Sequence, residues 1–327
     1  MTTTELATAA FYGLAIGDAL GMPTQMMSRK QIHARYGQLT GFEPGAADHP
    51  LTAGRLAGSI TDDTEQALLL ARHLVRHAGR VDATEFAHDL VSWEDEMRAR
   101  GSIDLLGPST SRAVSAVLDG VSVAEAGRYG TTNGAAMRVT PVGIVARSTD
   151  LEALVDRVVE ATRVTHDTGV AIAGASAVAA AVSAGLDGAT VRECLPMAIL
   201  AAAIGRDRGH WVAAADVSRR IEWAIGLADA GDIERSIDDV AELVGTSLAT
   251  QESVPAAFAI LALHPDDPWR AVLTAASVGG DADTIAAMVG AVAGACGGGF
   301  PATAIETVRA VNDLHLEPLA AELVALR

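Results

Sequence analysis

The chain has 327 residues and a formal net charge of −17, and half of its residues are hydrophobic while only 4% are aromatic. The acidic charge argues against nucleic acid and against an anionic membrane surface as partners, because both would be repelled. Alanine, leucine and valine supply much of the apolar content, and few aromatics are present, so we expect an all-α fold. No long Pro/Gly/Ser linker divides the chain, which predicts a single compact globular multi-helix domain over residues 1–327.

Helical segments recur from one end of the chain to the other. The first, over residues 4–20, has apolar positions at helical spacing. The next, over 61–79, opens with Thr-Asp-Asp, places Glu65 in its first turn and stops at Gly79, as a capped helix does. Later segments of helical character cover residues 82–99, 109–120, 150–165, 169–186, 191–205, 216–229, 236–245, 253–264, 268–279, 282–297 and 304–315.

One of these segments, residues 169–186, is about as long as a bilayer span and carries no charge. Its residues are mostly Ala, Gly and Ser, which gain little from lipid but let helices pack closely, so we expect an interior helix. The first 21 residues contain no basic leader, which predicts a cytoplasmic protein. Cys194 and Cys296 lie in apolar stretches and are expected to be buried free thiols. The oligomeric state is taken as monomeric by default.

Three loops interrupt the helical pattern, at residues 21–60, 127–143 and 277–284. The first is rich in Gly, Pro and His, with a short strand conceivable near residues 56–59, and the third reads Ser-Val-Gly-Gly-Asp-Ala-Asp-Thr. Loops held on a rigid scaffold are the usual place for binding and catalytic groups. We therefore expect the functional residues in these loops.

Two clusters of aspartate and threonine stand at predicted helix starts, one at residues 61–64 and one at residues 281–284. Oxygen ligands of this kind suit a hard divalent cation, magnesium first and manganese second, and they do not suit zinc or copper. Helix capping is the competing interpretation, since Asp and Thr are preferred at N-caps. The Gly279-Gly280 turn before the second cluster would let the backbone approach a ligand closely.

The chain resembles the ADP-ribosylglycohydrolase family through a series of motifs in the family's order. They are GLAIGDALGMP from Gly13, GSITDDTEQAL from Gly58, NGAAMRVTPVG from Asn133, VTHDTGVAIAGA from Val164, ESVPAAFAI from Glu252 and GGDADTIAAMVGAVAGA from Gly279. The resemblance implies an all-α globule with two Mg²⁺ ions, or Mn²⁺, at the floor of a cleft. It implies the metal ligands Thr61, Asp62, Asp63, Asp281, Asp283 and Thr284. Asp62 and Asp63 are the candidate catalytic residues, because a carboxylate there could accept a proton from water and stabilise an oxocarbenium-like state.

The resemblance also suggests substrate-binding residues. Asn133, Gly134, Met137 and Arg138 match a loop that wraps a phosphate-bearing ligand, and His166 matches a histidine of the cleft. Three of them have a structural alternative: Arg138 an internal ion pair, Met137 core packing, and His166 a cap or hydrogen-bonding partner. Asp18 is expected to be a buried carboxylate that anchors a turn.

Gln25 departs from the family pattern, because many members carry a glutamate at the corresponding position. A glutamine can ligate through its carbonyl or bind a hydroxyl, but it cannot act as a general base. The first hypothesis is therefore hydrolysis of the bond between ADP-ribose and an acceptor such as a protein arginine or serine side chain. The alternatives are hydrolysis of a small nucleoside-like or ADP-ribosyl metabolite, with Gln25 contacting that substrate, and a non-catalytic ADP-ribose-binding module. The expected partner is thus an ADP-ribose-containing or ribosyl compound, carried by a protein or free.

Overall fold

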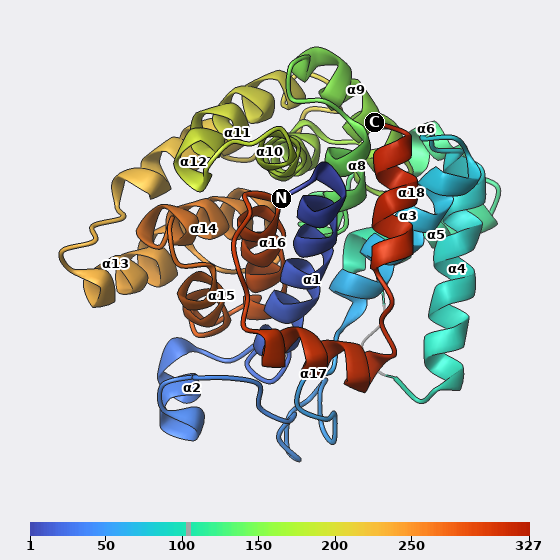
Figure 1. Ribbon diagram of the computed structural model, residues 1–327. Coiled ribbons are helices and arrows are strands. Elements are labelled where there is room, and N and C mark those ends of the chain that lie inside the picture. Colours follow the sequence, from blue (N-terminus) through green and yellow to red (C-terminus); the bar gives the residue numbers. More distant parts are fainter. Residues whose placement is uncertain (103–105) are drawn as a thin grey trace.

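The computed structural model describes residues 1–102 and 106–327, which form one all-α domain (Figure 1). The described residues contain no β-strand, and the segment near residues 56–59 is a turn. The N-terminal half comprises α1 (Thr3–Gly21), α2 (Arg29–Tyr36), α3 (Asp62–Arg76), α4 (Ala83–Ala99), α5 (Pro108–Leu118), α6 (Val123–Ala126), α7 (Gly134–Met137), α8 (Thr140–Val145) and α9 (Leu151–His166). The remainder comprises α10 (Gly169–Leu186), α11 (Val191–Gly205), α12 (Val217–Gly226), α13 (Ile233–Asp239), the π-helix η1 (Val240–Val244), α14 (Thr250–Leu263), α15 (Pro268–Ala276), α16 (Ala282–Ala295), α17 (Ala302–Asn312) and α18 (Glu317–Ala325).

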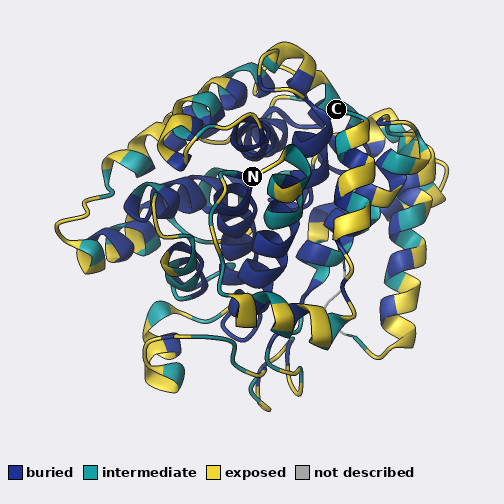
Figure 2. Ribbon diagram, viewed as in Figure 1, coloured by how far each residue is buried: buried dark blue, intermediate teal, exposed yellow. Residues whose placement is uncertain are grey.

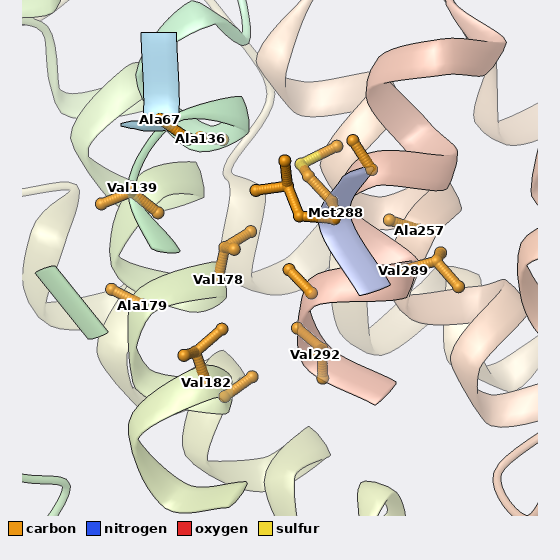
Figure 3. Packing of buried hydrophobic residues seen from close by; sticks show 14 of the residues in the cluster. Ala67, Ala136, Val139, Val178, Ala179, Val182, Ala257, Met288, Val289 and Val292 are labelled. Atoms are coloured by element: carbon orange, nitrogen blue, oxygen red, sulfur yellow. The ribbon is translucent and has the colours of Figure 1, made fainter. Parts of the chain in front are cut away.

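Two apolar helices, α10 and α16, form the centre of the molecule, and every residue of both is buried (Figure 2). Val178 and Val182 of α10 and Met288 and Val292 of α16 point into the space between the two helices (Figure 3). The apolar, uncharged α10 is therefore an interior helix, as its small residues predicted.

Helix α1 packs against α16 with almost no side chain between the two backbones. A Cβ atom at Gly13 would overlap the backbone of Gly290, and one at Gly17 would overlap that of Ala286. Only residues without a side chain, or with a small one, permit this approach. The contact fixes the C-terminal end of α1 against the N-terminal end of α16, which is where the candidate site lies.

The structure differs from the predicted pattern mainly in short helices. Helix α2 lies inside the predicted loop 21–60, and it begins with a Ser28–Gln31 capping box although only Ile32 among its residues is buried. The predicted loop 127–143 contains α7 and α8, and α18 follows the last predicted helix. These helices are too short for apolar periodicity to reveal them, so the cap or the tertiary packing defines them instead.

The two cysteines are free, as predicted, although Cys296 is only partly buried. Cys194 in α11 is fully buried, and its sulfur lies 3.4 Å from that of Cys296. The pair lies at the C-terminal end of α16, at the opposite end of that helix from the candidate site.

Candidate active site at the N-termini of α3 and α16

The two Asp/Thr clusters meet in space. The Thr284 hydroxyl donates a hydrogen bond to Oδ2 of Asp63 over 3.3 Å, across 221 residues of sequence. The end of α1 completes the junction, because a Cβ atom at Gly21 would overlap the backbone of Asp283. The packing of α1 on α16 therefore brings the second cluster beside the first.

Asp18 anchors the start of α3. Its carboxylate accepts hydrogen bonds from the backbone N–H and the hydroxyl of Thr61, at 2.9 and 2.8 Å, and from those of Thr64, at 3.1 and 2.5 Å. Asp18 is fully buried, and burial raises its pKa to about 6 against the opposing effect of these bonds. This confirms the predicted anchoring role. It also means that Asp18 and these hydroxyls hold the start of α3, while the carboxylates of Asp62 and Asp63 line a cavity.

A cavity of about 460 Å³ opens above the two helix starts. Its lining combines acidic and polar residues with apolar ones, among them Leu51, Leu106, Pro108, Met137 and Leu248. None of the described residues that line it is basic. We call it the acidic cavity; its polar lining consists of Gln25, Asp62, Asp63, Thr110, Thr132, Asn133, Ser247, Asp281, Asp283 and Thr284.

The carboxylates of the acidic cavity raise one another's proton affinity. Burial raises the pKa of Asp63 well above its usual range, and the neighbouring charges of Asp62, Asp18 and Asp281 add to this effect. Burial likewise raises the pKa of Asp281 to about 6. Oδ1 of Asp63 is buried and has no hydrogen-bond partner among the described residues. Like charges this close are costly without a counter-charge, which a bound cation would supply.

Capping, the competing interpretation, accounts for only part of this arrangement. Thr61 is the N-cap of α3, and its hydroxyl accepts from the backbone N–H of Asp63. Asp281 is the N-cap residue of α16, but its side chain accepts no capping hydrogen bond. Its carboxylate instead accepts from the side-chain amide of Asn133 over 2.5 Å. Asp281 therefore faces the cavity rather than its own helix.

The residues assigned as metal ligands from the sequence fit a hard cation. Asp62, Asp63, Asp281, Asp283 and Thr284 all line the acidic cavity and offer only oxygen atoms, the ligands that Mg²⁺ and Mn²⁺ prefer. Thr61 does not line the cavity; its hydroxyl lies between Asp18 and Asp63, at 2.8 and 3.2 Å from their carboxylate oxygens. Such a cation would bind these oxygen donors and would give the buried Oδ1 of Asp63 a partner.

The loop from Asn133 forms another wall of the cavity. Asn133, Gly134 and Met137 line it, and the Asn133 amide bridges Asp281 and the hydroxyl of Ser253 at 3.0 Å. A Cβ atom at Gly134 would lie 3.0 Å from Cε1 of His166, so glycine allows this loop to rest directly on the histidine ring. The structure thus places these three predicted residues at the cavity.

Arg138 and His166 lie behind the cavity wall and do not line it. Arg138 donates to Oε1 of Gln66 over 3.1 Å and to the hydroxyl of Thr165, and burial lowers its pKa to about 10. His166 is fully buried between the hydroxyls of Thr132 and Thr165, and burial lowers the pKa of its imidazole well below the usual range. The imidazole is therefore neutral at physiological pH.

Gln25 lines the cavity from the loop after α1. Its side chain is 95% buried, and its amide nitrogen Nε2 has no hydrogen-bond partner among the described residues. The following residue, Met26, has a left-handed backbone (φ 58°), and its N–H donates to the carbonyl of Gly280 over 2.6 Å. A buried amide donor that faces a cavity without a partner is a position for a ligand acceptor atom.

Sequence reasoning missed part of the lining. Ser247 and Leu248 reach the cavity because residues 131–133 pair with residues 248–250, where the Asn133 N–H donates to the Leu248 carbonyl over 2.9 Å. Sequence reasoning also missed Gln66, which does not line the cavity but donates a hydrogen bond to Asp62. Leu106, Gly107, Pro108 and Thr110, around the start of α5, also line the cavity, while residues 103–105 lie outside the described residues.

A larger hollow of about 840 Å³ lies between α2, α13 and α15 and shares Gly280 with the acidic cavity. Two of its three described acidic lining residues, Glu234 and Asp238, are already paired with Arg29, at 2.5 and 2.9 Å, and the third is Glu242. The smaller acidic cavity, with its cluster of carboxylates, is therefore the better candidate for catalysis.

The chain is similar to known proteins over its whole length. The family model described as ADP-ribosylglycohydrolase matches residues 1–327. A protein of Escherichia coli K12, YegU, is 34% identical over 99% of this chain and 98% of its own length. An ADP-ribosylarginine hydrolase of Pseudomonas putida is 28% identical, over 98% of this chain and 78% of its own length. In fold, the chain is similar to a solved structure titled ADP-ribosylglycohydrolase-related protein complex, with a TM-score of 0.69, 23% identity, and coverage of 99% of this chain and 98% of the other.

Proposed function

The chain belongs to the ADP-ribosylglycohydrolase family, whose members are glycosyl hydrolases of ADP-ribosylated substrates, and we propose that it cleaves the bond between ADP-ribose and an acceptor in the acidic cavity with two Mg²⁺ ions. One observation carries the proposal: carboxylates from two helix starts that lie 221 residues apart converge on one cavity. Such a convergence has a high electrostatic cost unless the site binds cations.

The residues proposed to hold the ions are the oxygen donors of the two clusters. Asp62 and Asp63 would bind from α3, Asp281, Asp283 and Thr284 would bind from α16, and the Thr61 hydroxyl would complete the set. When bound, Mg²⁺ supplies Lewis-acid polarisation and lowers the pKa of bound water. Mn²⁺ has the same ligand preference and is expected to substitute for it.

The chain's own carboxylates supply the remaining chemistry. Oδ1 of Asp63 is buried and has no hydrogen-bond partner among the described residues, so it is the oxygen proposed to accept a proton. In the proposed reaction, a water oxygen forms a bond to the anomeric carbon, the bond from that carbon to the acceptor breaks, and a proton passes from the water to Asp63. The same proton can then return to the leaving acceptor, so the net reaction is hydrolysis. Asp62 and Asp63 would also stabilise the oxocarbenium-like charge that develops on the ribose.

The apolar lining residues of the cavity support a substrate larger than the ribose alone. Leu106, Met137 and Leu248 add apolar surface to a lining that also holds the carboxylates, which suits a ligand with both polar and apolar parts. The net acidic charge of the cavity would oppose the phosphates of ADP-ribose, and the bound cations would offset that repulsion.

The unpartnered Gln25 amide supports a second candidate, a small ADP-ribosyl or nucleoside-like metabolite. A neutral amide donor matches an oxygen or nitrogen acceptor atom on the substrate. A cationic guanidinium would be matched better by a carboxylate at that position. Gln25 therefore favours an uncharged leaving group over an arginine side chain.

The test is hydrolysis by the purified protein with Mg²⁺, offered ADP-ribosyl-arginine, ADP-ribosyl-serine and a panel of nucleosides, with release of the free ribosyl product as the readout. The control is an Asp281→Asn/Asp283→Asn variant, which keeps the shape of the site and removes two charges. We expect product that EDTA abolishes and that the variant does not form. Product formation that is unaffected by EDTA or by the variant would disprove the metal-dependent mechanism.

A further inference from the structure

Arg138 is among the largest fully buried side chains of the protein, with 1% of its surface exposed. Its Nη1 atom donates to Oε1 of Gln66 over 3.1 Å, and its Nη2 atom donates to the hydroxyl of Thr165. The guanidinium carbon also lies 5.5 Å from the ring centre of Phe86. Both acceptors are neutral oxygens. A buried cation held by neutral groups is costly to bury, which calls for a role beyond packing.

Gln66 connects this cation to the acidic cavity. The side chain is fully buried in α3, one turn after Asp62, and its Nε2 atom donates to Oδ2 of Asp62 over 2.9 Å. The orientation of the amide is determined by its neighbours. Arginine has only donors, so it requires the amide oxygen, and the carboxylate accepts, so it requires the amide nitrogen. A flipped amide would place two donors against each other on one side and two acceptors on the other.

We propose that Gln66 is a positioning residue that holds the Asp62 carboxylate in one orientation toward the acidic cavity, and that Arg138 acts through Gln66 to fix that orientation. The proposal rests on the proposed function only in treating Asp62 as a cation ligand. Arg138 polarises the Gln66 amide, which strengthens the bond that the amide donates to Asp62, because hydrogen bonds in a chain reinforce one another. Partners of this kind behind a metal ligand typically change metal affinity or activity by about 10–100-fold when they are removed.

The same geometry allows two simpler roles for Arg138. The three roles predict different changes in cation affinity when Arg138 is removed. If Arg138 acted only as a nearby positive charge, its removal would strengthen cation binding in the cavity. If it only stabilised the fold, its removal would lower the melting temperature and leave cation binding unchanged. If it acts through Gln66 on Asp62, its removal weakens cation binding even though a repelling charge has been lost.

The experiment measures the Mn²⁺ dissociation constant by calorimetry without substrate, and the melting temperature in EDTA, for the full chain and four variants. Gln66→Met keeps the length of the side chain and removes both hydrogen bonds, and we expect Mn²⁺ to bind about ten-fold more weakly or worse. Arg138→Met should weaken Mn²⁺ binding in the same direction, and Arg138→Lys, which can still donate to Gln66, should restore much of it.

Arg157→Met is the matched control. Arg157 in α9 donates to the carbonyl of Gly79, at a position that does not line the acidic cavity. This variant should lower the melting temperature and leave the Mn²⁺ affinity unchanged. Tighter or unchanged Mn²⁺ binding in Arg138→Met would overturn the proposal, and so would unchanged binding in Gln66→Met.

Failure of the metal centre itself would be distinguishable. If the unaltered chain bound no Mn²⁺ in millimolar solution, the proposed function would be wrong, and the crystal structures of the unaltered chain and of Gln66→Met would then decide on the positioning role. A different orientation of the Asp62 carboxylate in Gln66→Met supports the positioning role. The same orientation in both structures refutes it.

Discussion

The hydroxyl of Thr284 donates a hydrogen bond to Oδ2 of Asp63 over 3.3 Å, and this contact joins the N-termini of α16 and α3. The helices α1 and α16 pack backbone to backbone, so their relative position is fixed by glycines rather than by adjustable side chains. The distance between the two acidic clusters is therefore a property of the scaffold. Changes in that scaffold, as well as changes in the carboxylates, should affect the site.

Removal of charge from Asp63 should stabilise the metal-free protein while it removes activity. Its carboxylate is buried, and its neighbours Asp62, Asp18 and Asp281 raise its pKa. Asp63→Asn relieves that repulsion and keeps the shape, so we expect a melting temperature in EDTA that is equal to or above that of the unaltered chain. Saturation with Mg²⁺ at about 100 times its dissociation constant should stabilise the unaltered chain by about 2.7 kcal/mol, and the variant by much less. Hydrolytic activity should fall at least about 100-fold. A variant that retains full activity, or one that unfolds in EDTA, would contradict this account.

The stability of the metal-free protein should fall as the pH rises. The pKa of Asp281 is raised to about 6 from its ordinary value of 3.8 by burial. The folded state then holds the proton more tightly than the unfolded state, so this contribution is complete below about pH 4 and is lost as the pH rises through 6. In EDTA, the melting temperature should therefore decrease between pH 5 and pH 7, by roughly 2 °C for each kcal/mol in a chain of this size.

Mg²⁺ should oppose this decrease, because it binds the ionised carboxylates and replaces their protons. The melting-temperature difference between Mg²⁺ and EDTA is expected to widen from pH 5 to pH 7. Asp281→Asn serves as the control, since it lacks the titrating group and should show a smaller slope in EDTA. A slope of the opposite sign in the unaltered chain would refute the assignment.

A charge at position 25 should change which acceptor is released. The Gln25 amide nitrogen is buried without a partner in the cavity, and Gln25→Glu replaces that donor with an acceptor of almost the same shape. A hydrogen bond to a charged group contributes about 1.5–3 kcal/mol, which corresponds to about ten-fold or more in rate. We expect the ratio of kcat/KM for ADP-ribosyl-arginine to that for ADP-ribosyl-serine to rise by about ten-fold in Gln25→Glu. Gln38→Glu adds the same charge at an exposed position outside the cavity lining and should leave the ratio unchanged. An unaltered ratio in Gln25→Glu would mean that this position does not contact the leaving group.

Much of the scaffold could be predicted from the sequence because its large helices carry strong local signals. The apolar, small-residue segment 169–186 and the capped segment beginning at Thr61 were both located within a few residues. The glycine motifs and paired aspartates likewise indicated where the cavity residues would come from. Local patterns of this kind are set by nearest neighbours along the chain, so the sequence contains them directly.

Other features depend on tertiary contacts and left no local signal. Arg138 had two interpretations of similar weight, a phosphate partner or an internal pair, and the structure places it against the neutral Gln66 oxygen. The sequence around Gln66 contains no signal that distinguishes it from other polar residues of a helix. Leu248 reaches the cavity only through its pairing with the loop at Asn133. Which polar groups face one another across a core depends on how the helices pack, and side-chain periodicity does not report that.

The glycine at the end of α1 provides a test of whether the scaffold sets the geometry of the site. A Cβ atom at Gly21 would overlap the backbone of Asp283, so Gly21→Ala must push α1 away from the start of α16. Overpacking of this kind costs about 1–3 kcal/mol, and it should also displace Asp283 from the carboxylates of α3. We therefore expect a lower melting temperature together with weaker Mn²⁺ binding that excess metal only partly restores. Gly226→Ala is the matched control, because nothing lies within 4 Å of a Cβ atom there and alanine favours the helix end, so its stability should be unchanged or slightly higher. If Gly21→Ala lowered the melting temperature but bound Mn²⁺ with full affinity, the two clusters would be positioned by something other than the contact between α1 and α16.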